Sequence, residues 1–248
     1  MSRYFIRLSY RGAPFHGWQI QPNAISVQEE IEKALSIALR APVALTGAGR
    51  TDTGVNARNM FAHFDFGPSL PDKGKLLVSL NRLCGKDIAI HDIIEVKDDA
   101  HARFDATERT YKYFVTFEKT PFFYPLSWFC SQRLDIRKMN EAAEVLLQTE
   151  DFTSFAKLHS DAKTNRCKVT KAEWKMTGES TAVFTITADR FLRNMVRAVV
   201  GTLVDVGRGK MSVDSFREVI ERKDRCAAGQ SMPGEALFLW DVKYDYIQ

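Results

Sequence analysis

The stretch GAGRTDTGVNA, residues 47–57, decides how this sequence is interpreted, because it sets an arginine and an aspartate in a glycine-rich turn. Residues 43–46 are predicted to form a strand leading into the turn, and residues 59–66 a strand leading out of it. The glycines allow positive φ or close approach of another backbone, and Asp52 can bond nearby amides. Two interpretations stay open at this point: a loop that presents Arg50 and Asp52 to a ligand, or an ordinary Asx turn beside a solvated charge.

The length and composition are those of a soluble globular protein. A chain of 248 residues can form one large or two small domains, and 45% hydrophobic with 27% charged residues is ordinary for such domains. No apolar run approaches the ~20 residues that span a membrane. The first residues, MSRYFIRLSY, lack the hydrophobic segment of a signal peptide. We therefore expect a cytoplasmic protein with no membrane partner.

The cysteines and histidines are scattered, with no CxxC and no Cys/His pair at metal-ligand spacing. This distribution argues against a zinc site and against a disulfide framework. We expect the thiols to be buried or idle. A protein without a bound metal is predicted. The positions concerned are Cys84, Cys130, Cys167, Cys226, His16, His63, His91, His101 and His159.

The net charge of +4 and the pI of about 8.8 permit a nucleic-acid partner without requiring one. Arg190, Arg193 and Arg197 are spaced i, i+3 and i+7, which places them on one face of a predicted helix, and Arg208 and Lys210 follow. Such a basic stripe is typical of phosphate contacts. The alternative is a solvated helix face.

Alternation and helical spacing predict further elements on both sides of the turn. In the first half they are a strand at 4–10, a helix from a Ser26/Glu29 capping box to residue 39, a helix at 73–82 and a strand at 88–96. In the second half they are strands at 110–117, 168–176, 181–188 and 237–246, and helices at 136–147, 191–204 and 212–222.

The charged stretch 97–109 is interpreted as the crossing between two halves, with the boundary near residue 105. The predicted domains are therefore residues 1–105 and 106–248. Because both mix strands with helices, we expect an α+β fold whose halves join through a mainly antiparallel sheet. In the loop HGWQIQPN, residues 16–23, Trp18 either stacks on a base or packs under the next helix, and we expect packing.

Six motifs in order along the whole chain resemble the tRNA pseudouridine synthase A (TruA) family. They are SYRGAPFHGWQIQPNAISVQ, GRTDTGVNA, RTYKYFV, DFTSFAK, FLRNMVRAVVG and EALFLWDV. The resemblance implies two α/β halves related by a pseudo-twofold, which share an extended antiparallel sheet with a central cleft. It also implies a homodimer that acts on tRNA. The implied reaction converts uridine to pseudouridine at positions 38–40 of the anticodon stem-loop, without a metal or organic cofactor.

The resemblance makes Asp52 the catalytic residue of that reaction. An ionised carboxylate can add to the sugar C1′ or remove the C2′ proton, and both routes stay open. A glycosidase needs two carboxylates. Here uracil is retained and adds again through its carbon 5, so one carboxylate suffices.

Four further residues acquire roles from the resemblance. Arg197 forms an ion pair with Asp52, which keeps a carboxylate ionised; the alternative is that Arg197 only meets a phosphate. Arg50 fills the space that the flipped base leaves. Tyr111 packs on the uracil and helps to remove the C5 proton, and Leu237 closes the other side of the pocket. By spacing alone Tyr111 and Leu237 are ordinary strand residues.

The chain departs from the family pattern at Asn56, where GVHA is usual and this sequence has GVNA. Asparagine offers a donor and an acceptor but does not titrate near neutral pH. If the usual histidine only orients the loop, activity survives the change. If it binds the RNA backbone, the preference among tRNA positions changes.

Two rival functions come from other classes. A non-catalytic RNA-binding module would explain the basic residues and aromatics but gives the Arg-Thr-Asp turn no purpose. A phosphate-binding enzyme would explain a glycine-rich loop. GAGRTDTG, however, lacks the Gly-Lys-Ser/Thr of a P-loop and the third glycine of a dinucleotide site.

Overall fold

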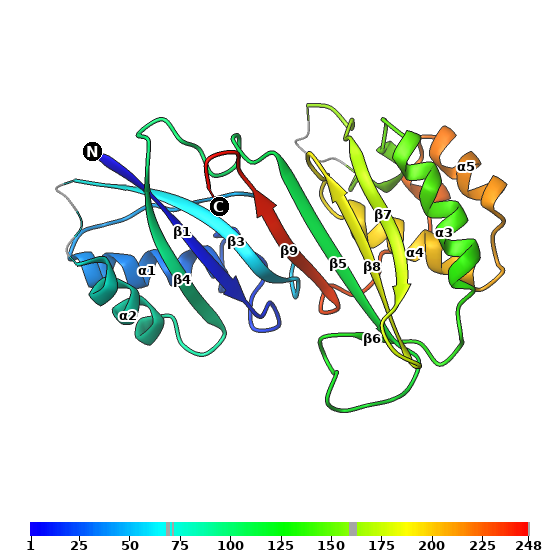
Figure 1. Ribbon diagram of the computed structural model, residues 1–248, viewed down its shortest axis with the longest axis horizontal. Coiled ribbons are helices and arrows are strands. Elements are labelled where there is room, and N and C mark those ends of the chain that lie inside the picture. Colours follow the sequence, from blue (N-terminus) through cyan, green and yellow to red (C-terminus); the bar gives the residue numbers. More distant parts are fainter. Residues whose placement is uncertain (68–69, 71, 159–162, 248) are drawn as a thin grey trace. The chain divides into compact units, whose positions relative to one another are not determined.

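The computed structural model describes residues 1–67, 70, 72–158 and 163–247, and Figure 1 shows its elements in chain order. Residues 1–107 and 239–248 form one compact unit, and residues 108–238 form the second. Both units combine helices with mainly antiparallel strands, as the predicted α+β class requires. Among the described residues, no helix is long and apolar enough to cross a membrane. His159 lies outside the described residues.

The first unit is built on antiparallel strands with two helices (Figure 1). Its strands are β1 (Ser2–Tyr10), β2 (Thr46–Gly47), β3 (Asn56–Phe66), β4 (Ile88–Val96) and most of β9 (Leu237–Lys243), and its helices are α1 (Val27–Leu39) and α2 (Lys73–Leu83). The strand order is β4-β1-β3-β9, and β2 pairs with β3. In the central strand, Ile6 lies opposite Ala62 on one side and Ile93 on the other.

Helix α1 begins where its capping box predicts. The Ser26 hydroxyl accepts the N–H of Glu29 at 3.2 Å, which satisfies one of the amides that the first turn leaves without a helical partner. Val27, Ile31 and Leu35 are fully buried on its apolar face. The helix ends at a left-handed residue after Leu39. By contrast, the strand predicted at residues 43–46 is wrong except for its last residue.

The second unit repeats the mixture of strands and helices. Its strands are β5 (Glu108–Thr116), β6 (Trp128–Phe129), β7 (Val169–Met176) and β8 (Thr181–Ala188), and its helices are α3 (Ile136–Val145), α4 (Met195–Gly207) and α5 (Val213–Glu221). Three single-turn 3₁₀ helices cover Leu146–Gln148, Thr153–Phe155 and Arg225–Ala227. The order β5-β8-β7 is antiparallel, β6 adds to β5 in parallel, and α3 contacts β7, α4 and α5.

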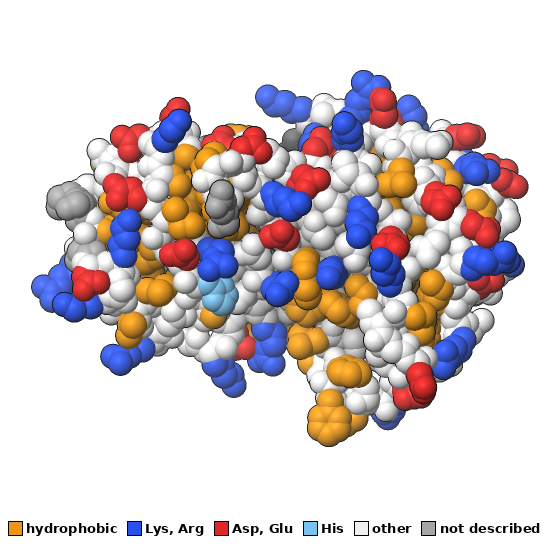
Figure 2. All heavy atoms as spheres, in the orientation of Figure 1, with side chains coloured by type: hydrophobic (Ala, Val, Ile, Leu, Met, Phe, Trp, Pro, Cys, Tyr) orange, Lys and Arg blue, Asp and Glu red, His pale blue; other side chains and the backbone are white. Residues whose placement is uncertain are grey.

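The predicted basic stripe is wrong, because α4 begins at Met195 and not at residue 191. Asn194 adopts φ 66°, a left-handed conformation that stops the helix from extending backwards. Arg190 and Arg193 therefore lie on the preceding loop, and only Arg197 is helical. On the face drawn in Figure 2, basic side chains are interspersed with acidic ones.

The loop before β6 exposes several aromatic side chains. Phe122 is 91% exposed and Tyr124 is 79% exposed. The loop projects below the strands in Figure 1, and hydrophobic side chains gather at the same edge of Figure 2. Exposed apolar groups of this kind are typical of surfaces that contact other macromolecules.

The thiols match the prediction of buried cysteines at three positions out of four. Cys84, Cys130 and Cys167 are buried, and Cys226 is exposed. Burial raises the pKa of Cys84 to about 11 and that of Cys167 to about 12. These two thiols are therefore protonated and unreactive near neutral pH.

Candidate active site

The loop 48–55 connects β2 to β3 and is fixed by contacts with β1 and the segment after it. Thr51 is buried, and its hydroxyl oxygen lies 2.8 Å from the phenol oxygen of Tyr10. The Thr51 carbonyl accepts the N–H of Trp18 at 3.2 Å. The residue immediately before Asp52 is thus held from two sides within one unit.

Trp18 packs inside the protein against this loop. Its side chain is 3% exposed, and its ring centroid lies 6.1 Å from that of Tyr10. A Cβ at Gly47 would lie 2.6 Å from the indole, closer than real Cβ contacts allow. Only glycine fits at this position. Burial of Trp18 inside the protein is confirmed, with contacts to Tyr10 and Gly47, while its packing under the next helix stays a prediction.

Asn56 closes the other end of the loop. Its side chain is 1% exposed, and its Oδ1 accepts the N–H of Gly12 at 2.9 Å. This hydrogen bond joins the first residue of β3 to the chain just after β1. Asn56 therefore ties this end of the loop to the segment after β1.

Asp52 lies at the tip of the loop and is half-buried, while Arg50 is exposed. The N–H of Val55 donates to the Asp52 carbonyl at 3.1 Å, so a main-chain hydrogen bond closes the turn. Of the three glycines in the turn, only Gly54 has a positive φ, 78°. The turn therefore needs Gly47 for close approach to Trp18 and Gly54 for its left-handed backbone.

The second unit contains Tyr111, Arg197 and Leu237. Tyr111 is half-buried on β5. Its ring packs edge-to-face with that of Phe191, with the centroids 5.0 Å apart and the ring planes at 84°. Leu237 is buried at the start of β9, where its N–H donates to the carbonyl of Gly234 at 2.9 Å.

Arg197 lies in the first turn of α4 and is held by a reciprocal pair of hydrogen bonds. Its Nε donates to the Met232 carbonyl at 2.6 Å, and the Met232 N–H donates to the Arg197 carbonyl at 3.1 Å. The segment around Met232 can lie this close only because residue 201 is glycine. A Cβ there would stand 1.8 Å from the carbonyl oxygen of Gln230.

The structure thus divides the predicted site residues between the two units. Arg50 and Asp52 share one loop of the first unit, and Tyr111, Arg197 and Leu237 belong to the second.

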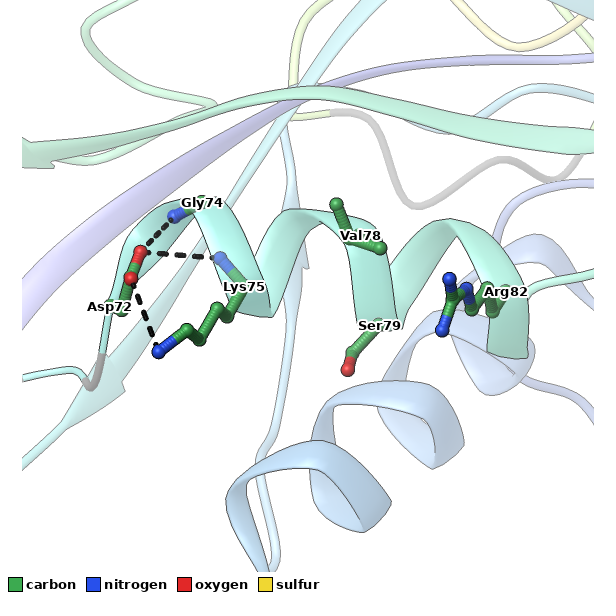
Figure 3. Close-up of a pocket in the computed structure, with 6 residues that line it drawn as sticks. All are labelled: Asp72, Gly74, Lys75, Val78, Ser79 and Arg82. Carbon is green, nitrogen blue, oxygen red and sulfur yellow. Dashed lines mark hydrogen bonds and ion pairs between the residues drawn. The ribbon is translucent and has the colours of Figure 1, made fainter.

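A shallow hollow of about 490 Å³ on the outer face of α2 is a separate feature (Figure 3). Asp72 is its carboxylate, and Oδ1 accepts the N–H groups of Gly74 at 2.9 Å and Lys75 at 3.2 Å. These bonds cap the helix, and the Lys75 ammonium lies 3.8 Å from the same carboxylate. The Asp72 carboxylate of this hollow therefore serves the helix itself.

Comparison with known proteins adds to this geometry. A family model described as tRNA pseudouridine synthase matches residues 142–245. The tRNA pseudouridine synthase A of Parabacteroides distasonis is 58% identical over 244 residues, which cover 98% of this chain and 96% of that protein. The protein of the same name from Bacillus subtilis is 39% identical over 242 residues, 96% of this chain and 97% of that protein. The chain belongs to the tRNA pseudouridine synthase A family.

Membership of the tRNA pseudouridine synthase A family confirms the resemblance drawn from the six motifs. A third relative, from Bacteroides fragilis, is 57% identical over 244 residues, 98% of this chain and 97% of that protein. Sequence reasoning missed four residues that hold the loop 48–55 or Arg197 in place: Gly12, Thr51, Gly201 and Met232. Only Gly201 left a signal, since a glycine inside a predicted helix indicates close packing.

Proposed function

We propose that this protein converts uridine to pseudouridine in tRNA, at positions 38–40 of the anticodon stem-loop, with Asp52 as the catalytic group. The observation that carries the proposal is the constraint on the loop 48–55. Thr51 is fixed from two sides, and Asn56 is bonded to Gly12 at 2.9 Å. A carboxylate on such a loop is placed by the fold before substrate arrives, as catalysis by positioning requires.

The reaction needs only one carboxylate. In the first route, Asp52 forms a bond to C1′ while the C1′–N1 bond breaks, and uracil leaves with that electron pair. In the second, Asp52 takes the C2′ proton as a C1′–C2′ double bond forms and uracil leaves with the N1 electron pair. Uracil then turns and its C5 bonds to C1′, which breaks the Asp52–C1′ bond in the first route or returns the proton from Asp52 to C2′ in the second. C5 finally loses its proton and N1 takes one up, so Asp52 ends as the free carboxylate.

The other residues bind and orient the nucleotide in this proposal. Arg197 pairs with the Asp52 carboxylate and keeps it ionised. Arg50, exposed on the same loop, takes the place of the flipped base. Tyr111 packs on the uracil and assists removal of the C5 proton, and Leu237 covers the other side. The edge contact of Tyr111 with Phe191 supports a fixed ring for that stacking.

The organisation of the molecule follows the same proposal. We also propose that the chain consists of two α/β halves, 1–105 and 106–248, related by a pseudo-twofold. We also retain a homodimer in the cytoplasm that uses no metal or cofactor. The mixed strand-and-helix composition of both units supports the two halves.

Asp52→Asn tests the proposal. We expect the variant to bind tRNA with the affinity of the unmodified protein and to release no tritium from tRNA labelled at uridine C5, because C5 loses its hydrogen only when the new bond forms. Asp214→Asn, at an exposed aspartate of α5, is the matched control and should retain full tritium release. Tritium release by Asp52→Asn at the unmodified rate would overturn the catalytic assignment.

A further inference from the structure

Residues 229–232 lie beside the first two turns of α4 and are hydrogen-bonded to that helix and its cap at three levels. The bonded pairs are Asn194 with Ser231, Arg197 with Met232, and Thr202 with Gly229. The segment itself adopts neither helix nor strand, so repetitive main-chain bonding does not fix its position. Its place beside α4 therefore depends on these separate contacts.

Arg225 binds the same segment. Its guanidinium donates to the carbonyls of Ala228 at 3.4 Å and Gly229 at 3.1 Å, and to the hydroxyl oxygen of Ser231 at 2.8 Å. A guanidinium carries its five donors in a rigid plane, so three acceptors bonded to one such plane are fixed relative to one another. The side chain is half-buried and comes from a single-turn 3₁₀ helix just before the segment. Arg225 therefore stabilises one conformation of residues 228–231.

The hydroxyl oxygen of Ser231 is shared by two donors. Besides the bond from Arg225, it accepts the side-chain N–H of Asn194 at 2.7 Å. Asn194 directly precedes α4, where an asparagine side chain ordinarily accepts an amide N–H of the first turn. Here its side chain makes no such capping bond. Through this one oxygen, Arg225 is connected to the start of the helix that carries Arg197.

We propose that Arg225 is a positioning residue for Arg197. The inference rests on the proposed function, in which Arg197 pairs with the Asp52 carboxylate. Ser231 is followed directly by Met232, whose carbonyl accepts the N–H of Arg197 Nε at 2.6 Å. Because a guanidinium is planar, fixing Nε restricts the directions in which its two terminal nitrogens can point. Arg225 holds the residues that place this carbonyl, and it acts on the reaction through the orientation of Arg197.

Arg225→Met tests this inference, since methionine keeps an apolar stem and removes every donor. We expect kcat for tritium release to fall about 10- to 100-fold, the effect of displacing a group that acts on the reaction by ~1 Å. KM and the Kd for tRNA should stay unchanged, because Arg225 has no proposed contact with RNA. Ser231→Ala is the milder second variant. It removes the shared acceptor but leaves Arg225 its two carbonyls, and should lower kcat by a smaller factor.

Two matched variants of the same unit separate positioning from general destabilisation. Ser154→Ala removes a buried hydroxyl that donates to the Val219 carbonyl at 2.6 Å. Arg217→Met removes an arginine whose partner is the exposed Asp214. The first should lower the melting temperature, and both should retain kcat per folded molecule. If Arg225→Met also retains kcat per folded molecule, the inference is wrong.

Arg225→Lys distinguishes the geometry of the side chain from its charge. Lysine keeps the positive charge, but its single nitrogen cannot span three separate acceptors. We expect the same fall in kcat as for Arg225→Met, with the affinity for tRNA unchanged. Full kcat in the lysine variant would overturn the inference. So would weak tRNA binding by Arg225→Met that lysine restores, since that pattern indicates a phosphate contact.

A double-mutant cycle with Arg197→Met tests whether Arg225 acts through Arg197. Single-turnover rates should be the same for Arg197→Met with or without Arg225→Met, because no guanidinium remains to be oriented. A further fall in the double variant would overturn the inference. Failure of the proposed function is distinguishable, since Asp52→Asn would then release tritium at the unmodified rate whatever the result at Arg225.

Discussion

Arg197 and Met232 exchange two hydrogen bonds, from Nε to the Met232 carbonyl at 2.6 Å and from the Met232 N–H to the Arg197 carbonyl at 3.1 Å. The side chain proposed to pair with the Asp52 carboxylate is therefore fixed by a segment 35 residues further along the chain. That segment reaches α4 only over the bare backbone of Gly201.

Gly201→Ala should disturb Arg197 without touching it. The new methyl group would stand 1.8 Å from the Gln230 carbonyl oxygen, so the segment must move away from the helix. We expect a loss of about 1–3 kcal/mol in the free energy of unfolding, as for other overpacked sites. Urea denaturation measures it, and tritium release should fall as well. Unchanged stability and rate would show that the segment moves freely and does not fix Arg197.

Gly47→Ala, at the end of β2, and Gly49→Ala, in the loop that follows it, form a matched pair. A Cβ at Gly47 would overlap the Trp18 indole at 2.6 Å, whereas a Cβ at Gly49 meets no described atom within 4 Å. The first change should cost about 1–3 kcal/mol of stability and the second much less, because only the first overpacks the core. Thermal unfolding of the two variants compares them. Equal melting temperatures would contradict the packing of Trp18 described above.

Asn56 offers a test of the one departure from the family pattern. Asn56→Ala leaves the Gly12 N–H buried without its acceptor, so we expect a loss of about 1–3 kcal/mol and a slower reaction. Asn56→His can supply a ring nitrogen as acceptor and should lose less of both. The measurements are urea denaturation and the positions of pseudouridine after carbodiimide derivatisation. A change of modified position in Asn56→His would indicate contact with RNA instead.

His63 should make stability depend on pH. Burial, Arg3 and His101 lower the pKa of His63 to about 4, from an ordinary value near 6.5. As the pH falls below 6.5 the unfolded chain takes up a proton that the folded protein does not take up until about pH 4. The stability contributed by neutral His63 is therefore complete above pH 6.5 and is lost between 6.5 and about 4, by at most ~1.4 kcal/mol per pH unit.

The check is urea denaturation from pH 7 to pH 4.5 for the unmodified protein and for His63→Gln. The variant should lose stability less steeply, and the slope that remains comes partly from His91 and His101, whose pKa values burial also lowers. His16→Gln, at an exposed histidine, is the control and should keep the original slope. Identical slopes for all three proteins would contradict the assignment to His63.

Cys226 should be the one thiol that reacts quickly in the folded protein. Cys84, Cys130 and Cys167 are buried, and burial raises the pKa of Cys84 and Cys167. A colorimetric disulfide reagent should label one equivalent rapidly near neutral pH and the rest only in denaturant. Cys226→Ser should abolish the rapid phase, and a rapid phase that persists would place the reactive thiol elsewhere.

The sequence predicted elements well where local chemistry determines them. The Ser26 cap and the alternation at 88–96 gave α1 and β4 at their observed bounds. The prediction failed where a single backbone angle sets the start of a helix. Asn194 has a left-handed conformation, so α4 begins at Met195 and excludes Arg190 and Arg193. The sequence also could not reveal the role of Met232. Its main-chain carbonyl binds Arg197, and any residue has such a carbonyl, so no sequence pattern marks the position.

The contacts of Thr51 and Asn56 have a thermodynamic consequence for the loop between them. Both ends are tied when the first unit folds, so the conformational entropy of the loop is lost at that step. Little of the free energy of RNA association is then needed to order the backbone around Asp52, and more of it remains to extract a base from its stack. Variants that loosen the loop should therefore bind folded tRNA more weakly while their affinity for an already unstacked strand changes less.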